Sequence, residues 1–341
     1  MLYHLAQKAL FATDPERAHE LTMESLRLGH RLGATAFVCQ RGGVAISCMG
    51  LEFPNPVGVA PGLDKNADYF EALGGLGFGF VEVGTVTPRP QPGNPRPRIF
   101  RLPAAQAMIN RLGFNSKGVD YLVQRVRRRR FDGILGINIG KNADTPMEQA
   151  AGDYLHCLEK VYPHADYVTV NVSSPNTPNL RELQAAALLD DLLARLAQRR
   201  LELSRRQHRR VPLAVKVAPD LDNEALDGIA QAVVRHEFAA VIATNTTLSR
   251  AGVEGLPYAD EAGGLSGAPL KARADDVLTS LRQRLPPGVA LIGVGGITRG
   301  SDAVDKVRRG ASLVQFYTGM VYRGPGLLGE CLQALTRETA A

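Results

Sequence analysis

Hydrophobic residues in this chain gather in eight short runs rich in β-branched residues, and the segments between the runs show helical spacing. The eight runs lie at 57–60, 80–86, 134–139, 167–172, 213–217, 240–244, 290–294 and 312–317. Helical spacing fills segments such as 146–162, 184–207, 223–237 and 270–285. Strands that alternate with helices form a parallel sheet, and eight such units predict an α/β fold, the closed (β/α)₈ TIM barrel. A doubly wound open sheet is the alternative, although no GxGxxG motif follows the first strand to support it.

The first 40 residues carry a different pattern, with two predicted helices before the first strand. One helix is indicated by apolar residues at helical spacing, namely Leu2, Leu5, Ala6, Ala9 and Leu10. The second begins at Asp14, which suits an N-cap, and Pro15, which suits the first helical position. Its apolar side chains form two stripes, one of Ala18, Leu21, Leu28 and Leu32 and one of Met23 and Leu26 on the side of His19. Two apolar faces need two apolar partners, the main domain on one side and either lipid or further protein on the other.

We therefore divide the chain into an N-terminal helical extension, residues 1–40, and a barrel domain, residues 41–341. A short hairpin around Gly50 is predicted within residues 44–53. Three loops are longer than a connection requires, at 87–116, 173–183 and 245–268. Each follows a predicted strand, so all three lie on one rim of the barrel, where barrel enzymes place their active sites.

Polar side chains lie at the carboxyl ends of the predicted strands, although a barrel interior is normally apolar. They are Asp64, Lys65, Thr85, Asn138, Asn171, Lys216, Thr244, Asn245 and Thr246. Burying so many amides and two lysines is costly unless they bind something. Glycines follow the last two strands, at 293–297 and 317–319. Because backbone N–H groups beside glycine can approach an anion, these two loops predict a phosphate site.

Ser174 lies in the loop after the fourth barrel strand, in the segment NVSSPNTPNLREL at 171–183. A serine here could be a nucleophile, a base or a turn residue. The chain has no GxSxG motif, and none of its seven histidines lies at a strand end. A hydrolase triad therefore has little support.

Composition narrows the classes of protein that fit. Hydrophobic residues make up 45% of the 341 residues and charged residues 22%, so the chain can bury a large core. The net charge of +6 fits nucleic acid, an anionic membrane or an arginine-rich exterior. The arginine runs carry no interleaved aromatic residues, so we expect no nucleic-acid binding.

The four cysteines form no CxxC pair and join no histidine cluster. Neither a metal site nor an iron–sulfur site is therefore expected, and reduced thiols fit a cytoplasmic setting. The chain begins without a signal-peptide pattern. It also has no run of about 18 apolar residues that could span a bilayer.

In combination, these motifs resemble those of the class 2 dihydroorotate dehydrogenases, the bacterial, membrane-associated and quinone-dependent type. The resemblance covers nearly the whole chain. The motifs that carry it are DPERAH at 14–19, PGLDKN at 61–66, GTVTPRPQPGNPRPRIFRL at 84–102, INRLGFNS at 109–116, GINIGKN at 136–142, NVSSPNTP at 171–178, VKVAPD at 215–220, ATNTT at 243–247, GGLSG at 263–267, GVGGI at 293–297 and ASLVQFYTG at 311–319. Class 1 relatives have a cysteine in place of Ser174 and lack the N-terminal helices.

The resemblance implies that FMN is the cofactor and that it lies across the rim. The residues implied to bind it are Pro61, Gly62, Leu63, Asp64, Lys65, Thr85, Asn138, Asn171, Lys216 and Thr244, with Gly267, Gly296, Tyr317 and Thr318 at its phosphate. The residues implied to bind dihydroorotate are Lys65, Asn110, Arg111, Leu112, Gly113, Phe114, Asn171, Asn176, Asn245 and Thr246. Ser174 is the implied catalytic base, which takes a proton from C5 of the substrate while hydride leaves C6 for the flavin. Lys216 is implied to stabilise the negative charge that develops on the flavin.

The resemblance also implies a second half-reaction, in which a membrane quinone accepts the electrons. His19, Arg101 and Tyr317 would line the path between the helices and the flavin. The product, orotate, belongs to pyrimidine (UMP) biosynthesis. The protein would bind peripherally to the cytoplasmic face of the cell (inner) membrane, and a monomer is compatible with the sequence.

Two other functions are weighed against this one. A flavin barrel that reduces uridine in RNA uses a cysteine acid, and none of the four cysteines here lies in a rim motif. A non-catalytic, basic barrel that binds RNA or membrane would carry no flavin.

Overall fold

The computed structural model describes residue 7, residues 10–40 and residues 42–340. Of the first predicted helix, Leu2, Leu5, Ala6 and Ala9 lie outside the described residues, whereas Leu10 is in helical conformation.

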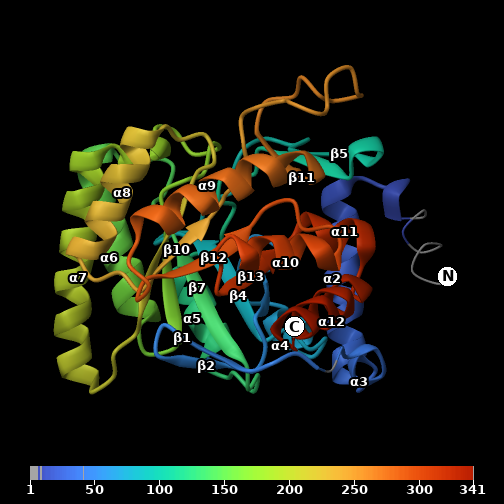
Figure 1. Ribbon diagram of the computed structural model, residues 1–341, viewed down its shortest axis with the longest axis horizontal. Helices are drawn as coiled ribbons and strands as arrows, with labels where there is room; N and C mark the ends of the chain where they lie inside the picture. The colour runs from blue at the N-terminus through green and yellow to red at the C-terminus, as the bar shows by residue number, and fades with distance from the viewer. Residues whose placement is uncertain (1–6, 8–9, 41, 341) are drawn as a thin grey trace.

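Eight parallel strands close into a barrel (Figure 1). They are β3 (Val57–Val59), β4 (Phe80–Val86), β7 (Ile134–Ile139), β8 (Tyr167–Asn171), β9 (Leu213–Val217), β10 (Ala240–Ala243), β12 (Ala290–Val294) and β13 (Leu313–Phe316). The last strand, β13, pairs in parallel with the first, β3, and closes the ring. Side chains alternate along each strand, so β4 turns Phe80 into the barrel and Val81 toward the helices. The predicted (β/α)₈ barrel is confirmed.

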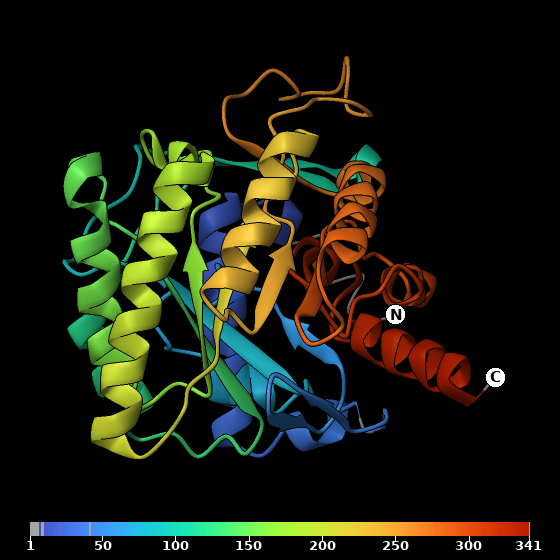
Figure 2. The same cartoon turned by 60° about the vertical axis from the view of Figure 1, so that its left-hand side comes forward.

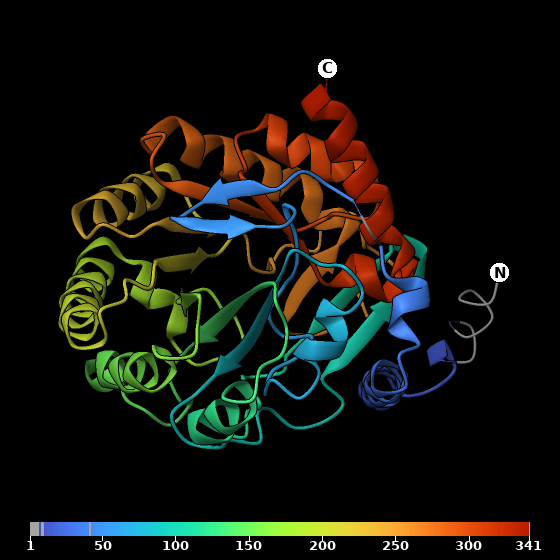
Figure 3. The same cartoon turned by 90° about the horizontal axis from the view of Figure 1, so that it is seen from below.

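Helices form a ring outside the barrel, as the view from below shows (Figure 3). They are α4 (Phe70–Gly74), α5 (Val119–Val126), α6 (Ala150–Val161), α7 (Ala186–Gln207), α8 (Asn223–Arg235), α9 (Lys271–Arg284), α10 (Gly300–Arg308), α11 (Thr318–Arg323) and α12 (Gly326–Ala340). On one flank α6, α7 and α8 pack side by side (Figure 2). Val81 and Leu135 of the strands and Leu158 and Leu192 of the helices belong to one fully buried layer. Each such side chain contributes about 1.5–3 kcal/mol of burial free energy.

A β-hairpin closes the end of the barrel opposite the rim. Its strands β1 (Ile46–Cys48) and β2 (Leu51–Phe53) are joined by Met49 and Gly50, with φ of 57° and 74°. Positive φ at both central residues is the geometry of a type I′ turn, whose twist matches the strands. Phe53 meets Phe80 edge to face, with ring centroids 5.3 Å apart. The predicted hairpin around Gly50 is confirmed, and the barrel interior is reached from the opposite rim.

The rim carries a second sheet that the sequence pattern does not predict. Its strands β5 (Ile99–Leu102), β6 (Ala107–Asn110) and β11 (Gly264–Gly267) pair antiparallel, with β6 in the middle. Two of the long loops, 87–116 and 245–268, are thereby joined above the barrel mouth (Figure 1). Each strand has only four residues, and proline and glycine flank them, so turn signals dominate the local pattern.

The N-terminal helix α2 (Pro15–Arg31) lies against the side of the barrel, next to α4 and β5. Asp14 caps it, since its carboxylate accepts the backbone N–H groups of Glu16 and Arg17. At the same end Glu16 is buried and forms an ion pair with Arg98, which precedes β5. This pair ties the start of α2 to the rim.

The structure does not keep the two predicted apolar stripes of this helix as two separate faces. Ala18 belongs to the predicted stripe with the leucines, but it is buried, as is Met23 of the other stripe. Leu21, Leu28 and Leu32 are 50%, 59% and 76% exposed. The short helix α3 (Thr35–Val38) adds Phe37, which is 92% exposed. Within the described part of the chain, no helix has the length and hydrophobicity needed to cross a membrane.

Candidate active site

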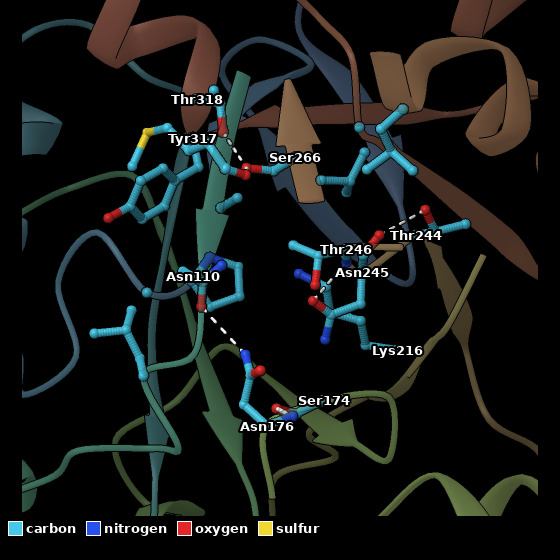
Figure 4. A pocket seen from close by; sticks show the side chains of 18 of the residues that line it. Asn110, Ser174, Asn176, Lys216, Thr244, Asn245, Thr246, Ser266, Tyr317 and Thr318 are labelled. Carbon is cyan, nitrogen blue, oxygen red and sulfur yellow. Dashed lines mark hydrogen bonds between the residues drawn. The ribbon is translucent and has the colours of Figure 1, made fainter. Parts of the chain in front are cut away.

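A cavity lies between the barrel mouth and the rim sheet. Most of the residues predicted from the sequence line it, namely Pro61, Gly62, Lys65, Thr85, Asn110, Leu112, Gly113, Phe114, Asn171, Ser174, Asn176, Lys216, Thr244, Asn245, Thr246, Gly267, Gly296, Tyr317 and Thr318. Figure 4 shows Asn110 and Tyr317 on one side, facing Lys216 and Asn245 across the gap. The cavity therefore gathers side chains from segments far apart in the sequence.

One end of the cavity is lined by glycines that cannot be replaced without a clash. A Cβ on Gly296, where φ is 77°, would lie 2.4 Å from the Cα of Lys271. A Cβ on Gly267, where φ is 100°, would lie 2.2 Å from the carbonyl oxygen of Gln106. Beside them, the Thr318 hydroxyl donates to the Ser266 hydroxyl at 2.8 Å. Backbone N–H groups beside glycines, together with two hydroxyls, are a suitable surface for a phosphate.

The wall formed by β8 and β10 carries amide side chains in one hydrogen-bonded chain. Asn171 Nδ2 donates to Thr85 Oγ1 at 2.9 Å, and Asn245 Nδ2 donates to Ser173 Oγ at 2.9 Å. Ser173 Oγ donates in turn to Asn171 Oδ1 at 2.9 Å. Across the cavity, Asn176 Nδ2 donates to Asn110 Oδ1 at 3.3 Å. These amides are held in place and can offer both donors and acceptors to a planar ligand.

Two lysines line the cavity, Lys65 partly buried and Lys216 buried, and neither donates a hydrogen bond to a described residue. Burial lowers the pKa of Lys65 to about 8, with the charge of Glu16 acting in the opposite direction. Burial also lowers the pKa of Lys216, which is only 5% exposed, and the charge of Glu82 opposes this shift. An ammonium group at a cavity that donates to none of the described side chains or carbonyls indicates an anionic or strongly polar ligand.

Ser174 lines the cavity and is 5% exposed. Its Oγ accepts the backbone N–H of Asn176 at 3.2 Å, and its hydroxyl donates to no described residue. The following Pro175 also lines the cavity and restricts the loop. The oxygen is therefore held in place, and the hydroxyl proton is not used by any described residue.

Four of the residues predicted to bind FMN or substrate do not line the cavity. Leu63 is part of the outer core, and Arg111 pairs with Glu261 at 2.5 Å and covers the ring of Phe100 at 4.6 Å. Asp64 accepts the backbone N–H groups of Asp68 and Tyr69, and burial raises its pKa to about 6. Asn138 lies below the cavity floor, where it accepts the Thr85 hydroxyl at 2.5 Å.

Of the residues predicted for a quinone path, only Tyr317 lines the cavity. Arg101 donates to the carbonyl oxygen of Leu10 at 3.0 Å and lies over the ring of Phe11 at 4.7 Å. His19 lies on α2 beside the backbone of Leu63, and burial lowers its pKa to about 4, assisted by the charge of Lys65.

Arg101 and Phe11 line a second hollow, and Ile99 lines both this hollow and the cavity. The side chain of Ile99 therefore lies between the cavity and the hollow next to the N-terminal region.

Sequence reasoning did not single out several residues of the site. Ile99, Met108 and Ser266 line the cavity because the rim sheet brings them over the barrel mouth. Ser266 belongs to the segment GGLSG, in which the sequence pattern drew attention to the glycines and not to the serine. Glu82 lies inside the barrel. The sequence could have indicated it, because Glu82 is the single acidic residue in the otherwise apolar run FVEVGTV.

The comparisons with known proteins agree with this geometry. The family model for dihydroorotate dehydrogenase matches residues 44–338. The chain is 56% identical to dihydroorotate dehydrogenase (quinone) of Acinetobacter baylyi, with 98% of this chain and 100% of that protein covered. It is 57% identical to the protein of the same description from Burkholderia multivorans, with 100% of this chain and 99% of that protein covered.

Among solved structures, the crystal structure of DHODH from Eimeria tenella in complex with ferulenol is similar, with a TM-score of 0.86 and 37% identity over 96% of this chain and 92% of that one. The same barrel and nearly the whole length are thus shared with relatives of one description. The chain belongs to the dihydroorotate dehydrogenase family.

Proposed function

We propose that this chain oxidises (S)-dihydroorotate to orotate with FMN as prosthetic group and passes the electrons to a membrane quinone, in pyrimidine (UMP) biosynthesis. The observation that carries the proposal is the convergence of two unpartnered lysines, a chain of amides and a glycine-lined end in one cavity. The relatives described as dihydroorotate dehydrogenase (quinone) support the substrate and the acceptor.

The cavity fits FMN by the chemistry of its two ends. Gly267, Gly296 and Thr318 would hold the phosphate, because backbone N–H groups and a hydroxyl are good anion donors. Lys216 and Asn171 would meet the polar edge of the ring system. When bound, FMN supplies the acceptor for the hydride that leaves the substrate and the donor of electrons to the quinone. Leu63, Asp64 and Asn138 do not line the cavity, so they would affect FMN binding only by holding neighbouring residues in place.

Dihydroorotate is a ring of amide and carbonyl groups that bears a carboxylate. Asn110, Asn176 and Asn245 offer amides to the ring, and Lys65 offers a cation to the carboxylate. The segment from Leu112 to Phe114 closes the same side of the cavity. Arg111 points its guanidinium at Glu261 instead, so it would contribute through the backbone.

Ser174 is the proposed base that takes the proton from C5 of the substrate. A serine hydroxyl is a poor base at neutral pH, so it needs a site from which water is excluded. The low exposure of Ser174 limits its contact with water, and the hydrogen bond from the Asn176 N–H fixes the position of its oxygen.

The N-terminal extension, residues 1–40, is the proposed access route for quinone. Leu28, Leu32 and Phe37 expose apolar surface that could enter the lipid at the cytoplasmic face of the cell membrane, where the protein would be bound peripherally. From there the route would lead past His19 and Arg101 to Tyr317. Removing residues 1–40 should preserve flavin binding and transfer to a small soluble acceptor, and should abolish efficient transfer to a long-tailed quinone. An unchanged rate with that quinone, in a folded and flavin-loaded truncation, would exclude this role.

The substrate proposal is tested without any quinone. The purified protein should be yellow, release FMN on heating, and lose its flavin absorbance when dihydroorotate is added without oxygen. A protein that carries flavin but is not bleached by dihydroorotate would act on another substrate. A colourless protein that gains no flavin from added FMN would not be a flavoenzyme.

A further inference from the structure

A short segment of the long loop after β4, residues 91–94 with the sequence QPGN, has no role in the proposed function, although it borders one wall of the cavity. It lies beside residues 112–114, all three of which line the cavity. The carbonyl oxygens of four consecutive residues, 111–114, accept hydrogen bonds from this segment at 2.9 to 3.1 Å. Asn94 supplies two of them, from its side-chain amide and its backbone N–H, and the side chain of Gln91 supplies the other two. A whole turn at the cavity is therefore held through its carbonyl groups.

Gln91 uses every hydrogen-bonding group of its side-chain amide. Its Nε2 donates to the carbonyl oxygens of Gly113 at 3.1 Å and Phe114 at 3.0 Å. Its Oε1 accepts Asn142 Nδ2 at 2.8 Å and the backbone N–H of Ala143 at 2.9 Å. Both amide hydrogens and both lone pairs are thus occupied, which fixes the side chain in one orientation. Gln91 therefore links the turn at the cavity to the loop that follows β7.

The turn needs such a restraint because two of its residues have left-handed backbone conformation. The φ angle is 70° at Gly113 and 54° at Phe114. Glycine adopts this conformation readily, and a Cβ at Gly113 would lie 2.8 Å from Cγ of Asn94. Phe114 lacks that freedom, because a side chain disfavours positive φ. The two carbonyl groups that Gln91 holds belong to the peptide units on either side of the Phe114 Cα, so Gln91 stabilises the unfavourable conformation directly.

Holding the carbonyl groups also decides where the N–H groups of the turn point. In a trans peptide the C=O and the N–H of one unit point in opposite directions. The carbonyl groups of Leu112 and Gly113 face residues 91–94, so the N–H groups of Gly113 and Phe114 face the other side, where the cavity lies. Neither N–H group donates to a described residue. Two backbone donors are therefore available to a ligand in the cavity.

We propose that Gln91 is a positioning residue for the substrate, which holds the turn at 112–114 so that the N–H groups of Gly113 and Phe114 donate to acceptor oxygens of dihydroorotate. Gln91 does not itself line the cavity, so it acts through the turn. This inference rests on the proposed function, because dihydroorotate is the proposed ligand. None of the residues proposed to hold FMN belongs to this turn. Loss of Gln91 should therefore weaken substrate binding and leave FMN in place.

The test is the binding of orotate, the product, measured by calorimetric titration of the full chain loaded with FMN. Gln91→Met keeps the length of the side chain and removes its hydrogen bonds. Orotate should then bind about tenfold more weakly, because the two N–H donors are no longer held toward the ligand. The KM for dihydroorotate should rise by a similar factor while kcat changes less, as expected when an interaction common to the bound substrate and the transition state is lost. The FMN content of the purified variant should equal that of wild type.

A second variant and a second measurement isolate the turn. At neutral pH, Gln91→Glu keeps the acceptor for Asn142 and Ala143 and removes only the two donors to the turn, so it should weaken orotate binding at least as much as Gln91→Met. It carries the same test if Gln91→Met folds poorly. Amide hydrogen exchange then follows the peptide that covers residues 112–114. Orotate should slow exchange of this peptide in wild type, because the free N–H groups become bonded, and should slow it much less in either variant.

Asn55 provides a matched control at the opposite end of the barrel. Like Gln91, it holds backbone groups through both ends of its amide, since Nδ2 donates to the Gly77 carbonyl oxygen at 3.0 Å and Oδ1 accepts the N–H groups of Val57 and Gly79, both at 3.1 Å. Asn55→Ala should lower the melting temperature and leave orotate binding unchanged.

Unchanged orotate binding in Gln91→Met, or binding that Gln91→Glu restores, would overturn the proposal. Equal weakening in Asn55→Ala would also overturn it, because a general loss of stability would then explain the effect. A wild-type protein that binds no orotate and is not reduced by dihydroorotate would instead refute the proposed substrate.

Discussion

Arg98 offers the sharpest stability test, because one buried guanidinium ties the N-terminal helix to the rim. Arg98 is 6% exposed and makes four hydrogen bonds: two to Glu16, at 3.1 and 2.6 Å, and one each to the carbonyl oxygens of Pro92 and Asn94, at 2.7 and 2.8 Å. Arg98→Met removes all four and leaves a buried carboxylate behind.

The size of the effect follows from what remains around Glu16. Breaking a buried ion pair on one side costs about 3–5 kcal/mol. Arg96 stays within 3.0 Å of Glu16, but it is 62% exposed and can replace only part of the lost charge. We expect a loss of about 3 kcal/mol, at the lower end of that range. For a chain of this length this corresponds to a fall in Tm of about 4 °C, from the average unfolding entropy per residue.

The assay is a double-mutant cycle with Arg98→Met, Glu16→Gln and the two combined, followed by circular dichroism on heating. The double variant should be more stable than Arg98→Met, because the stranded charge is gone. Burial alone would raise the pKa of Glu16, but Arg98 and Arg96 lower it below its ordinary value of 4.5. The pair therefore stabilises the fold fully above about pH 4.5, and the difference between wild type and Arg98→Met should shrink as the pH falls through the lowered pKa. A loss below about 1 kcal/mol, the range of exposed pairs, or a cycle without coupling would refute the reasoning.

Two further predictions concern the chemistry of the cavity. Ser174→Ala should retain FMN, but dihydroorotate should reduce that FMN about 10²–10⁴-fold more slowly in stopped-flow measurements, because a proton acceptor is lost. An unchanged rate would exclude Ser174 as the base. Ser174→Cys should retain slight activity with a changed pH profile. The KM for dihydroorotate should rise above about pH 8, where Lys65 loses the proton that pairs with the substrate carboxylate; Lys65→Arg should move that rise to higher pH, and a flat profile in the wild type would mean that Lys65 does not meet the carboxylate.

The barrel could be predicted from the sequence because each of its strands is a separate apolar run, and the pattern of eight runs needs no knowledge of side-chain contacts. The turn at Met49 and Gly50 could be predicted for the same local reason. The rim sheet could not, because the pairing of β6 with β11 joins residues more than 150 positions apart, as Asn110 with Gly264.

The site divides in the same way. Residues at strand ends, such as Lys216 and Asn245, could be placed at the cavity because the carboxyl ends of parallel strands share one rim. Asp64 and Arg111 belong to two other motifs of the family resemblance, but the carboxylate of Asp64 accepts backbone N–H groups and the guanidinium of Arg111 pairs with Glu261. The partners of Glu82 come from three strands, and only the closed ring brings them to one carboxylate.

The central proposal is that FMN bound in this cavity accepts electrons from dihydroorotate and passes them to a quinone. The most direct measurement reduces the purified protein with dihydroorotate in the absence of oxygen, removes excess substrate, and follows the return of flavin absorbance with a quinone, fumarate or NAD as acceptor. We expect full reduction of the flavin by dihydroorotate, rapid reoxidation by the quinone and little reoxidation by fumarate or NAD. Rapid reoxidation by fumarate or NAD with none by the quinone would contradict this proposal.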